Sequence, residues 1–556
     1  MPMNEATLIH ELDLMSKDAT GNNSTFMAEN EYLQDRYEGN LYGDELPERS
    51  KVISNDVMDL VEADMPSLAR IFLGPSEIVK FEPNNPSNQE DVDEAESKTK
   101  YVDWQIRKQP WSFPLLHGFI KNAEILKTTV LKYYMEETTE VEEHKKTGLS
   151  DTELAVFQES LKGENVQSVE VVREEENDED ENTVVLKVEK TRKKVTLLNV
   201  ELEDFRMTKN ARNKDDAELV GDVALMKRGD LVAMGFSREI VSTLQSTSKL
   251  IENSRLPEIR DESEGGPETQ QIQSNWASEE VEVQNLYPLI DYDDDGILER
   301  RCIMRCGDVI LKNEVFNHVP YAIMSAIMMP HKAIGKSRAE IVAPTARIKT
   351  AILRGINDNI YAVTSPRMAT NDLVDDDDML VIRPNGQIRC AGETPPSNNI
   401  FPIQIPYIGD KALQVIQYWD QSRAQTTGSL LASQGLDADE LGQETATRFE
   451  GIKDASGAKV ELVARVMAET GFRQLYEGVA WLDSNFQNTK VEKQVLGEEL
   501  KVSPTDWKFT HNVVSKVGLG AGDDEKTLQT MSALWAIHTQ LKEANSPMTD
   551  EVKRFN

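Results

Sequence analysis

The stretch "SRAEIVAPTARIKTAILRGINDNIYAV", residues 337–363, decides how the chain is organised, because it predicts one long helix. Its isoleucines recur at helical spacing and form one stripe, with the basic residues of its middle off that stripe. Ser337 and Glu340 form an S-x-x-E capping box, Gly335 lets the chain turn into the helix, and Pro344 is expected to bend its start. The stripe contains Ile341, Ile348, Ile352, Ile356 and Ile360, and the basic residues are Arg347, Lys349 and Arg354.

Four further segments follow this helix. Residues 364–408 hold short alternating stretches, turns and prolines, which predict a small β module. A second helix is expected over 409–427, and the loop "GSLLASQGLDADELGQ" follows at 428–443. Residues 444–488 predict one long helix. The order is therefore helix, β module, helix, loop, long helix.

The regions on either side combine helices with antiparallel strands. One expected helix near the start takes Ser54 as its N-cap and is interrupted at Pro66. Alternation of apolar and polar residues then predicts strands, with the acidic run 174–182 at a solvated hairpin tip. These patterns place the chain in the α+β class.

Composition bounds the function. The 556 residues carry a formal net charge of −36, a field that repels nucleic acid rather than gripping it. No apolar run approaches the roughly 20 residues of a membrane-spanning helix, so no membrane is expected as a partner. The three cysteines have neither the even number of a disulfide framework nor zinc spacing. A specific DNA reader is thus disfavoured.

The stretch "DYDDDGILER", residues 291–300, has the aspartates that begin a calcium loop. Asp291, Asp293 and Asp295 are weak candidate ligands, but the twelfth position, which needs a bidentate glutamate, is Cys302. The flanks alternate like strands, so an Asp-Gly hairpin turn with solvated carboxylates is the favoured interpretation. A calcium-dependent structural or interaction protein stays as the alternative function.

Motifs of enzymes are incomplete in this sequence. The "GKS" at 335–337 ends like a phosphate-binding loop, yet the glycine required five residues earlier is Pro330. A glycine-rich turn near residue 520 has Asp523 where a dinucleotide loop needs its third glycine. No nucleophile, base and orienting group stand at a recognisable spacing. We therefore expect no enzymatic activity and no cofactor.

The order of segments, together with several local stretches, resembles the portal proteins of tailed bacteriophages, and most closely those of short-tailed phages. The stretches include "RYEGNLYGDELPERSKVISNDVMDLVEADMPSLARIF", "HKAIGKSRAEIVAPTARIKTAILRGINDNIYAVTSPR" and "ARVMAETGFRQLYEGVAWL". Two more are "YPLIDYDDDGILERR" and "GSLLASQGLDADELGQETATR". Together they cover about a third of the chain and are spread over most of its length.

This resemblance implies a portal fold with an α/β wing, a two-helix stem, a small β-rich clip, a tunnel loop and a helical crown. Its parts would be 1–334 (N-terminal helices and β-rich wing), 335–363 (first stem helix), 364–408 (clip), 409–427 (second stem helix), 428–443 (tunnel loop), 444–488 (long wing helix) and 489–556 (wing return and start of the crown). Portals are ring channels, commonly of twelve subunits, at one capsid vertex of the virion.

The resemblance also implies what such a ring does and meets. Double-stranded DNA passes through it without sequence preference during packaging and ejection. Terminase docks on the clip during packaging, and tail adaptor or head-completion proteins dock there later. The major capsid and scaffolding proteins would surround the ring during assembly in the host cytoplasm.

Candidate residues for these roles follow from the same segments. The isoleucine stripe would bury against a neighbouring subunit. Three stem cations either form thin positive rings in the channel or pair with acids between subunits, and pairing is favoured. The acidic run of the clip either meets a basic partner or is a solvated loop. The channel and tunnel-loop candidates are Lys349, Arg354, Arg423, Ser433, Gln434, Asp437 and Asp439, and the clip candidates are Asp375, Asp376, Asp377, Asp378 and Arg383.

Overall fold

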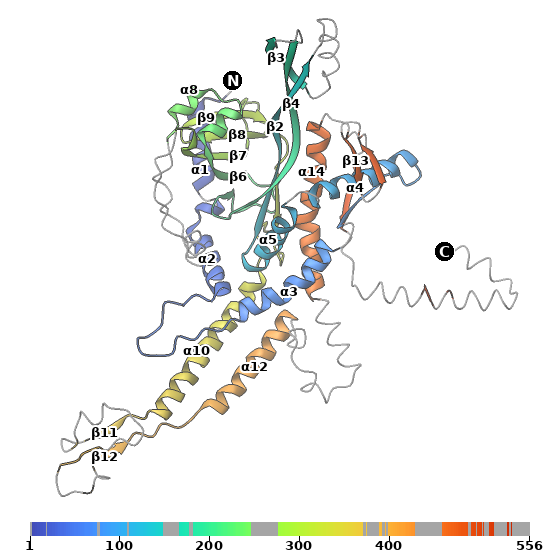
Figure 1. Cartoon of the computed structure of the whole chain (residues 1–556). Coiled ribbons are helices and arrows are strands. Elements are labelled where there is room, and N and C mark those ends of the chain that lie inside the picture. Colours follow the sequence, from blue (N-terminus) through green and yellow to red (C-terminus); the bar gives the residue numbers. More distant parts are fainter. Residues whose placement is uncertain are drawn as a thin grey trace, which may run out of the picture.

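A body of helices and two larger sheets carries a projecting pair of helices in the computed structural model of the chain (Figure 1). The structure describes residues 3–17, 19–74, 78–107, 111–147, 166–176, 182–245, 276–370, 388–391, 399–428, 459–487, 491–495, 498–502 and 511–515, and the single positions 374, 395, 504, 507, 531, 532 and 535. Every pairing between its named strands is antiparallel, which is consistent with the predicted α+β class.

A five-stranded sheet forms one side of the body. Its order is β5-β6-β7-β8-β9, a meander in which neighbours along the chain pair. Leu8 and Leu12 of α1 (Glu5–Lys17) are buried against apolar residues of this sheet, including Leu219 and Ile303. The strands are β5 (Phe205–Met207), β6 (Leu219–Lys227), β7 (Glu280–Ile290), β8 (Glu299–Cys306) and β9 (Val309–Val315).

A second sheet, ordered β10-β2-β4-β3, contains two long strands, β2 (Thr129–Thr147) and β4 (Asn182–Val200). Strand β10 (Tyr321–Met324) lies at one edge and β3 (Val166–Glu176) at the other. Strands β3 and β4 pair antiparallel up to Glu176 and Asn182, so they form the predicted hairpin, but Glu174–Glu176 of the acidic run belong to β3 itself. Residues 177–181 lie outside the described part.

The main core lies between this second sheet and four helices. Helix α14 (Arg473–Phe486) crosses β2 so closely at Gly478 that an added Cβ atom would lie 2.1 Å from the Tyr133 ring. Phe72 stacks on Phe472 with ring centroids 4.5 Å apart. The other helices are α3 (Asp56–Leu73), α4 (Gln89–Arg107) and α5 (Ser112–Ile125), and the small sheets are β1 (Val79–Glu82) with β15 (Asn512–Ser515) and β13 (Val491–Val495) with β14 (Glu498–Val502).

Helix α3 corrects one expectation, because it runs through Pro66 without a break. Burial explains this: Val61, Met65 and Leu68 around the proline are all buried in the core. Tertiary packing therefore outweighs the lost hydrogen bond of the proline. Ser54 is not the N-cap either, since the helix begins at Asp56 and the Ser54 hydroxyl donates to the Asp56 carboxylate at 2.7 Å.

The expected long helix near the C-terminus is present in its described part, residues 459–486, with one irregular turn. That turn is a π-helix over Ala468–Phe472. Gly471 lies in it, and a Cβ atom added there would be 2.6 Å from the Met324 Cβ. The widened turn thus sits where this helix approaches strand β10 most closely.

Two helices leave the body together, and we call them the arm (Figure 1). They are α10 (Arg338–Thr364) and α12 (Gly409–Thr427), and they pack side by side. At their far end β11 (Met368–Thr370) pairs with β12 (Ile400–Pro402). The remaining helices are α2 (Ser24–Glu38), α7 (Arg228–Ala233) and α8 (Arg238–Thr243), with short 3-10 turns at Thr20–Asn22 and Trp276–Ser278. No helix in the described ranges is both long and apolar enough to cross a membrane.

Candidate functional site

The first helix of the arm starts as its sequence predicts. The Ser337 hydroxyl accepts a hydrogen bond from the Glu340 amide at 3.0 Å, which confirms the N-cap. Gly335 approaches the Ile327 carbonyl so closely that a Cβ atom would lie 2.1 Å from it. The Glu340 carboxylate pairs with Lys336 at 3.2 Å. The "GKS" sequence therefore opens a helix, and Pro344 is accommodated in its second turn.

A buried ion cluster joins the arm to the body, and we call it the root cluster (Asp56, Lys349, Asp420 and Arg423). The Asp56 carboxylate of α3 accepts from the Lys349 ammonium at 2.8 Å and from the Arg423 guanidinium at 2.5 Å. Lys349 also pairs with Asp420 at 2.6 Å. Two acids thus balance two cations, and one carboxylate of the body holds both arm helices. Such hydrogen-bonded pairing is what makes buried charges tolerable.

The third predicted stem cation, Arg354, holds a connection of the body against α10. This connection, residues 39–55, links α2 to α3, and we call it the strap. Arg354 pairs with Asp44 at 2.9 Å and with Glu45, and its Nε donates to the Val52 carbonyl at 3.0 Å. All three stem cations therefore pair with acids of their own chain, which limits the positive charge that they present to any channel.

A second buried cluster lies above the first, where Arg338 faces two acids. Its guanidinium is 3.1 Å from the Asp64 carboxylate and 3.8 Å from that of Glu124, and it donates to the Thr427 carbonyl at 2.8 Å. Burial raises the pKa of Glu124 to about 8 and that of Asp64 to about 6, while Arg338 opposes both shifts. One guanidinium does not compensate two buried carboxylates, so Glu124 carries a proton at neutral pH.

The end of α12 and the start of the next described helix lie next to each other, and we call this place the neck (Arg338, Thr427, Gly428 and Lys459). The Lys459 ammonium donates to the Gln425 carbonyl and to the Thr426 carbonyl at 3.3 Å. A Cβ atom on Gly428 would lie 2.9 Å from the Lys459 Cβ. Two cations therefore satisfy the last carbonyls of α12, a favourable place for positive charge. The predicted loop residues Ser433, Gln434, Asp437 and Asp439 lie outside the described residues.

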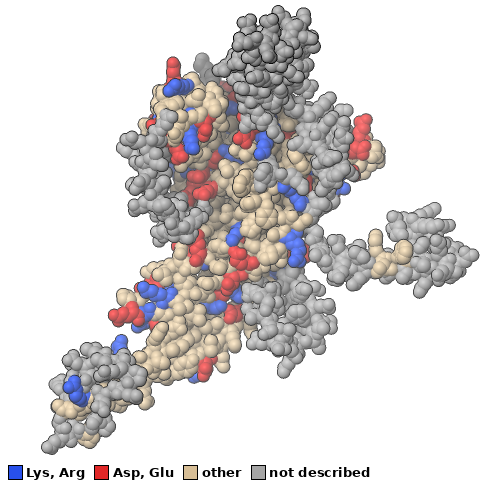
Figure 2. All heavy atoms as spheres, in the orientation of Figure 1, with Lys and Arg blue, Asp and Glu red and all other residues tan. Residues whose placement is uncertain are grey.

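The arm exposes an unusual amount of apolar surface, and Figure 2 shows it mostly free of charged side chains. Of the predicted stripe, Ile341, Ile348 and Ile360 are exposed, and Ile352 and Ile356 are half-buried. On α12, Tyr418 is 64% exposed. Other exposed apolar residues of the arm and its tip are Tyr361, Val363, Met368, Phe401, Ile403, Ile405, Tyr407, Ile408, Leu413 and Val415.

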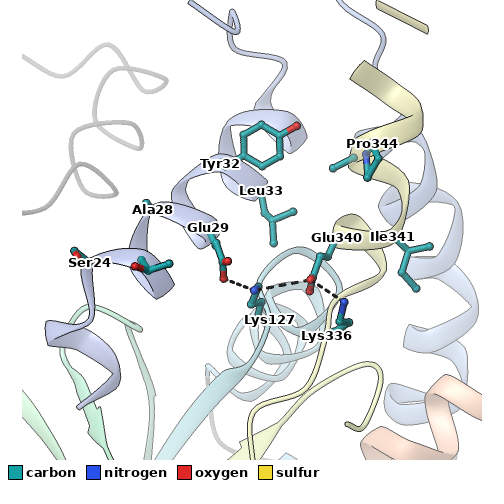
Figure 3. A pocket seen from close by; sticks show the side chains of 12 residues that line it. Ser24, Ala28, Glu29, Tyr32, Leu33, Lys127, Lys336, Glu340, Ile341 and Pro344 are labelled. Atoms are coloured by element: carbon teal, nitrogen blue, oxygen red, sulfur yellow. Dashed lines mark hydrogen bonds and ion pairs between the residues drawn. The ribbon is translucent and has the colours of Figure 1, made fainter. Parts of the chain in front are cut away.

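A groove opens between α2 and the start of α10, with a volume of about 890 Å³ (Figure 3). Tyr32 and Leu33 point into it from α2, and Ile341 and Pro344 line its other side. Lys127 crosses its floor between Glu29 and the Glu340 carboxylate, 3.8 Å away. This groove continues the apolar surface of the arm toward the body.

The sequence model of one known family, described as the phage SU10 portal protein, matches residues 8–556, nearly the whole chain. The chain belongs to this portal-protein family. The predicted resemblance to short-tailed phage portals is thereby confirmed. No curated protein matches the chain. Portal proteins are structural, so the family agrees with the expectation that the chain is not an enzyme.

The structure describes only part of the segment predicted to form the clip. The predicted β module contains the β11–β12 pair and an isolated bridge between Val374 and Cys390. Residues Asp375–Asp378 and Arg383 lie outside the described residues, so their partner-docking role stays a prediction. The described part of this tip instead presents exposed apolar side chains, among them Phe401.

The calcium-like stretch of the portal chain forms a hairpin turn between β7 and β8, as favoured from the sequence. The Asp291 carboxylate accepts from the amides of Asp295 at 3.1 Å and Gly296 at 2.8 Å. Asp294 and Gly296 both have positive φ, 63° and 84°. Asp291 thus stabilises the turn itself, and among the described residues no group of three or more metal-binding side chains is assembled.

Calcium is expected to leave the melting temperature (Tm) of the protein unchanged at millimolar concentration, because Cys302 stands where a calcium loop needs its bidentate glutamate and the described aspartates are not gathered into a ligand group. A saturated site would stabilise the fold by about 2.7 kcal/mol at a hundredfold excess over Kd. Thermal melts with calcium and with a chelator measure this. A calcium-dependent rise in Tm that Asp291→Asn abolishes would support the alternative function instead.

The acids that hold the arm were missed from the sequence. No pattern around Asp56 distinguishes it in the sequence, and its partners lie 293 and 367 residues away along the chain. The sequence indicates these acids only indirectly. Lys349 and Arg354 lie off the apolar stripe of their helix, and buried cations require carboxylate partners. Which carboxylates serve is not readable from spacing.

Proposed function

We propose that copies of this chain assemble into a ring, commonly of twelve subunits, that forms the DNA channel at one capsid vertex. The observation that supports it most is the arm, whose exposed apolar residues have no cover within the described part of the chain. Exposed apolar surface of this extent marks an interaction site. Head-to-tail contacts that close on themselves bury such surfaces on both flanks of every subunit.

In this ring the arm is the stem, residues 364–408 form the clip and residues 428–443 the tunnel loop that faces DNA. The sheets and the long helix over 444–488 form the wing, and residues 489–556 complete the wing and begin the crown. The net charge of −36 per chain and the in-chain pairing of Lys349, Arg354 and Arg423 both favour a wall over which DNA slides. No enzymatic step is assigned to the chain.

The partners of this ring follow from the same proposal. Terminase docks on the clip while double-stranded DNA is packaged, and tail adaptor or head-completion proteins replace it before ejection. The major capsid and scaffolding proteins contact the wing during assembly in the host cytoplasm. The exposed apolar residues at the tip of the arm, including Phe401 and Tyr407, support a docking role there.

Negative-stain images of the purified chain are expected to show rings with a central hole, because the apolar arm surface is buried only by neighbours. The particle mass in solution should be a multiple of the 62.6 kDa chain and match the symmetry seen in the images. A chain that stays monomeric at high concentration, or that closes into twofold dimers, would contradict the proposed ring.

A further inference from the structure

The strap, residues 39–55, is long for a connection without secondary structure of its own, and such connections are usually functional. It lies firmly against α10. The Ser50 amide donates to the Asp358 carboxylate at 2.7 Å, and the Ser54 amide donates to the Thr350 hydroxyl at 3.0 Å. Together with the contacts of Arg354, these hydrogen bonds fix the strap as a defined surface.

Apolar side chains on the strap nevertheless point into solvent. Leu41 is 52% exposed, Leu46 is 56% exposed and Val52 is 41% exposed. Met58, one turn into α3, extends this row and is 42% exposed. The groove of Figure 3 lies on the same flank of α10, since Ala343 is two turns before Thr350 on that face. This flank therefore presents several exposed apolar side chains on a fixed backbone, interspersed with exposed charged residues of the strap such as Glu48 and Lys51.

The opposite flank of α10 is occupied by α12. The strap is hydrogen-bonded to Thr350, Arg354 and Asp358, which lie one turn apart along one side. Two other residues of α10 contact α12 or the residue before it: Lys349 and Asn359. Lys349 is five positions before Arg354 and Asn359 is five positions after it. Each is therefore rotated about 140° from Arg354 around the helix axis, one in each direction. Figure 1 shows the resulting order of strap, α10 and α12 across the arm.

Both surfaces also lie at one height along the arm. Lys349 pairs with Asp420, and the Asn359 side chain accepts from the Ile408 amide at 3.1 Å. These two contacts bracket about 15 Å of α10. Arg354, which holds Glu45 and Val52, lies midway between them. The exposed residues Val415 and Tyr418 of α12 lie in the same interval and, three positions apart, on one face of that helix.

We propose that, in the ring, the strap of one subunit packs on the outward face of α12 in the next subunit. Leu46 and Val52 would then meet Val415 and Tyr418, which share one face of α12. A head-to-tail ring brings opposite flanks of equal height together, and both of these flanks expose apolar residues that the described part of the chain leaves uncovered. The proposal rests on the proposed ring and adds which surfaces close it.

Cysteine cross-linking of assembled rings tests this contact. The double variant Leu46→Cys/Tyr418→Cys, treated with a short bismaleimide, is expected to give a ladder of covalent oligomers on a denaturing gel. Each single variant and the unmodified chain, which has three cysteines of its own, should remain mostly monomeric. A matched control is Leu14→Cys/Tyr418→Cys, because Leu14 of α1 is equally exposed, at 58%, but lies away from the arm.

The outcomes separate this contact from the ring itself. Intact rings whose double variant gives no ladder, or gives only a cross-link within one chain, would overturn the strap contact and leave the ring standing. Absence of rings would remove both. As a second measurement, Leu46→Asp is expected to lower the urea concentration at which rings dissociate, with little change in the Tm of the dissociated chain, whereas Leu14→Asp should change neither.

Discussion

Asp56→Ala is expected to lower the free energy of unfolding by about 3–5 kcal/mol, the usual cost of breaking a buried ion pair by removing one partner. Asp56 is 2% exposed and accepts from both Lys349 and Arg423, so its loss leaves two buried cations with only Asp420 nearby in the root cluster. The arm helices would lose the carboxylate that fixes them to α3. Urea and thermal unfolding of the variant measure the effect.

Asp59→Ala is the matched control for this experiment, because Asp59 lies one turn further along the same helix, is exposed, and interacts with Lys349 and Arg423 through charge at longer range. Its removal should change the free energy of unfolding by less than about 1 kcal/mol. Equal effects of the two variants would show that the root cluster contributes nothing specific. Asp56→Asn, which keeps an acceptor oxygen but no charge, should fall between the two.

Glu124 is expected to make the stability of the wild-type chain fall as the pH rises from about 5 to 8, and Glu124→Gln is expected to remove this contribution. Burial raises the pKa of Glu124 from 4.5 to about 8, so the folded chain holds more protons than the unfolded chain between these values. A raised carboxyl pKa therefore destabilises the fold increasingly as pH climbs through this window. The neutral glutamine avoids the buried charge.

The size of this difference should be on the order of 4–5 kcal/mol at pH 9 and about 1 kcal/mol at pH 5, and it should vanish only below the unfolded pKa of 4.5, where Glu124 is protonated in both states. Unfolding at several pH values measures it. Asp483, whose pKa burial also raises to about 8, adds a slope that both proteins share, and Asp483→Asn isolates that share. Parallel pH profiles for wild type and Glu124→Gln would contradict the assignment of a protonated Glu124.

Local signals in the sequence were sufficient for the elements that depend on neighbours in the chain. The Ser337 cap, the helix after it and the hairpin around Gly296 all arise from interactions within a few residues, so their spacing reveals them. Pro66 shows the limit of the same reasoning. Its helix is continuous because buried residues on both sides hold it in the core, and that burial depends on distant segments.

The candidate site was less predictable than the fold. The cations Lys349, Arg354 and Arg423 were visible in the sequence, but each has an acid partner in α3 or the strap, hundreds of residues earlier, and Lys349 has a second one in α12. The pairing within one chain, rather than between subunits, follows from how the body meets the arm. The π turn at Ala468–Phe472 was hidden for a similar reason, since it accompanies contact with Met324 in another part of the chain.

The neck predicts that the sequence between Gly428 and Lys459 tolerates insertions, deletions and substitutions. Since the two flanking residues touch, whatever chain joins them begins and ends in the same place, and its length adds only slowly to the entropy of closure. Arg338 and Lys459 hold the end of α12 regardless of what lies between. Insertions, deletions or charge changes between these two residues are therefore expected to leave the ends of α12 and of the following helix in place.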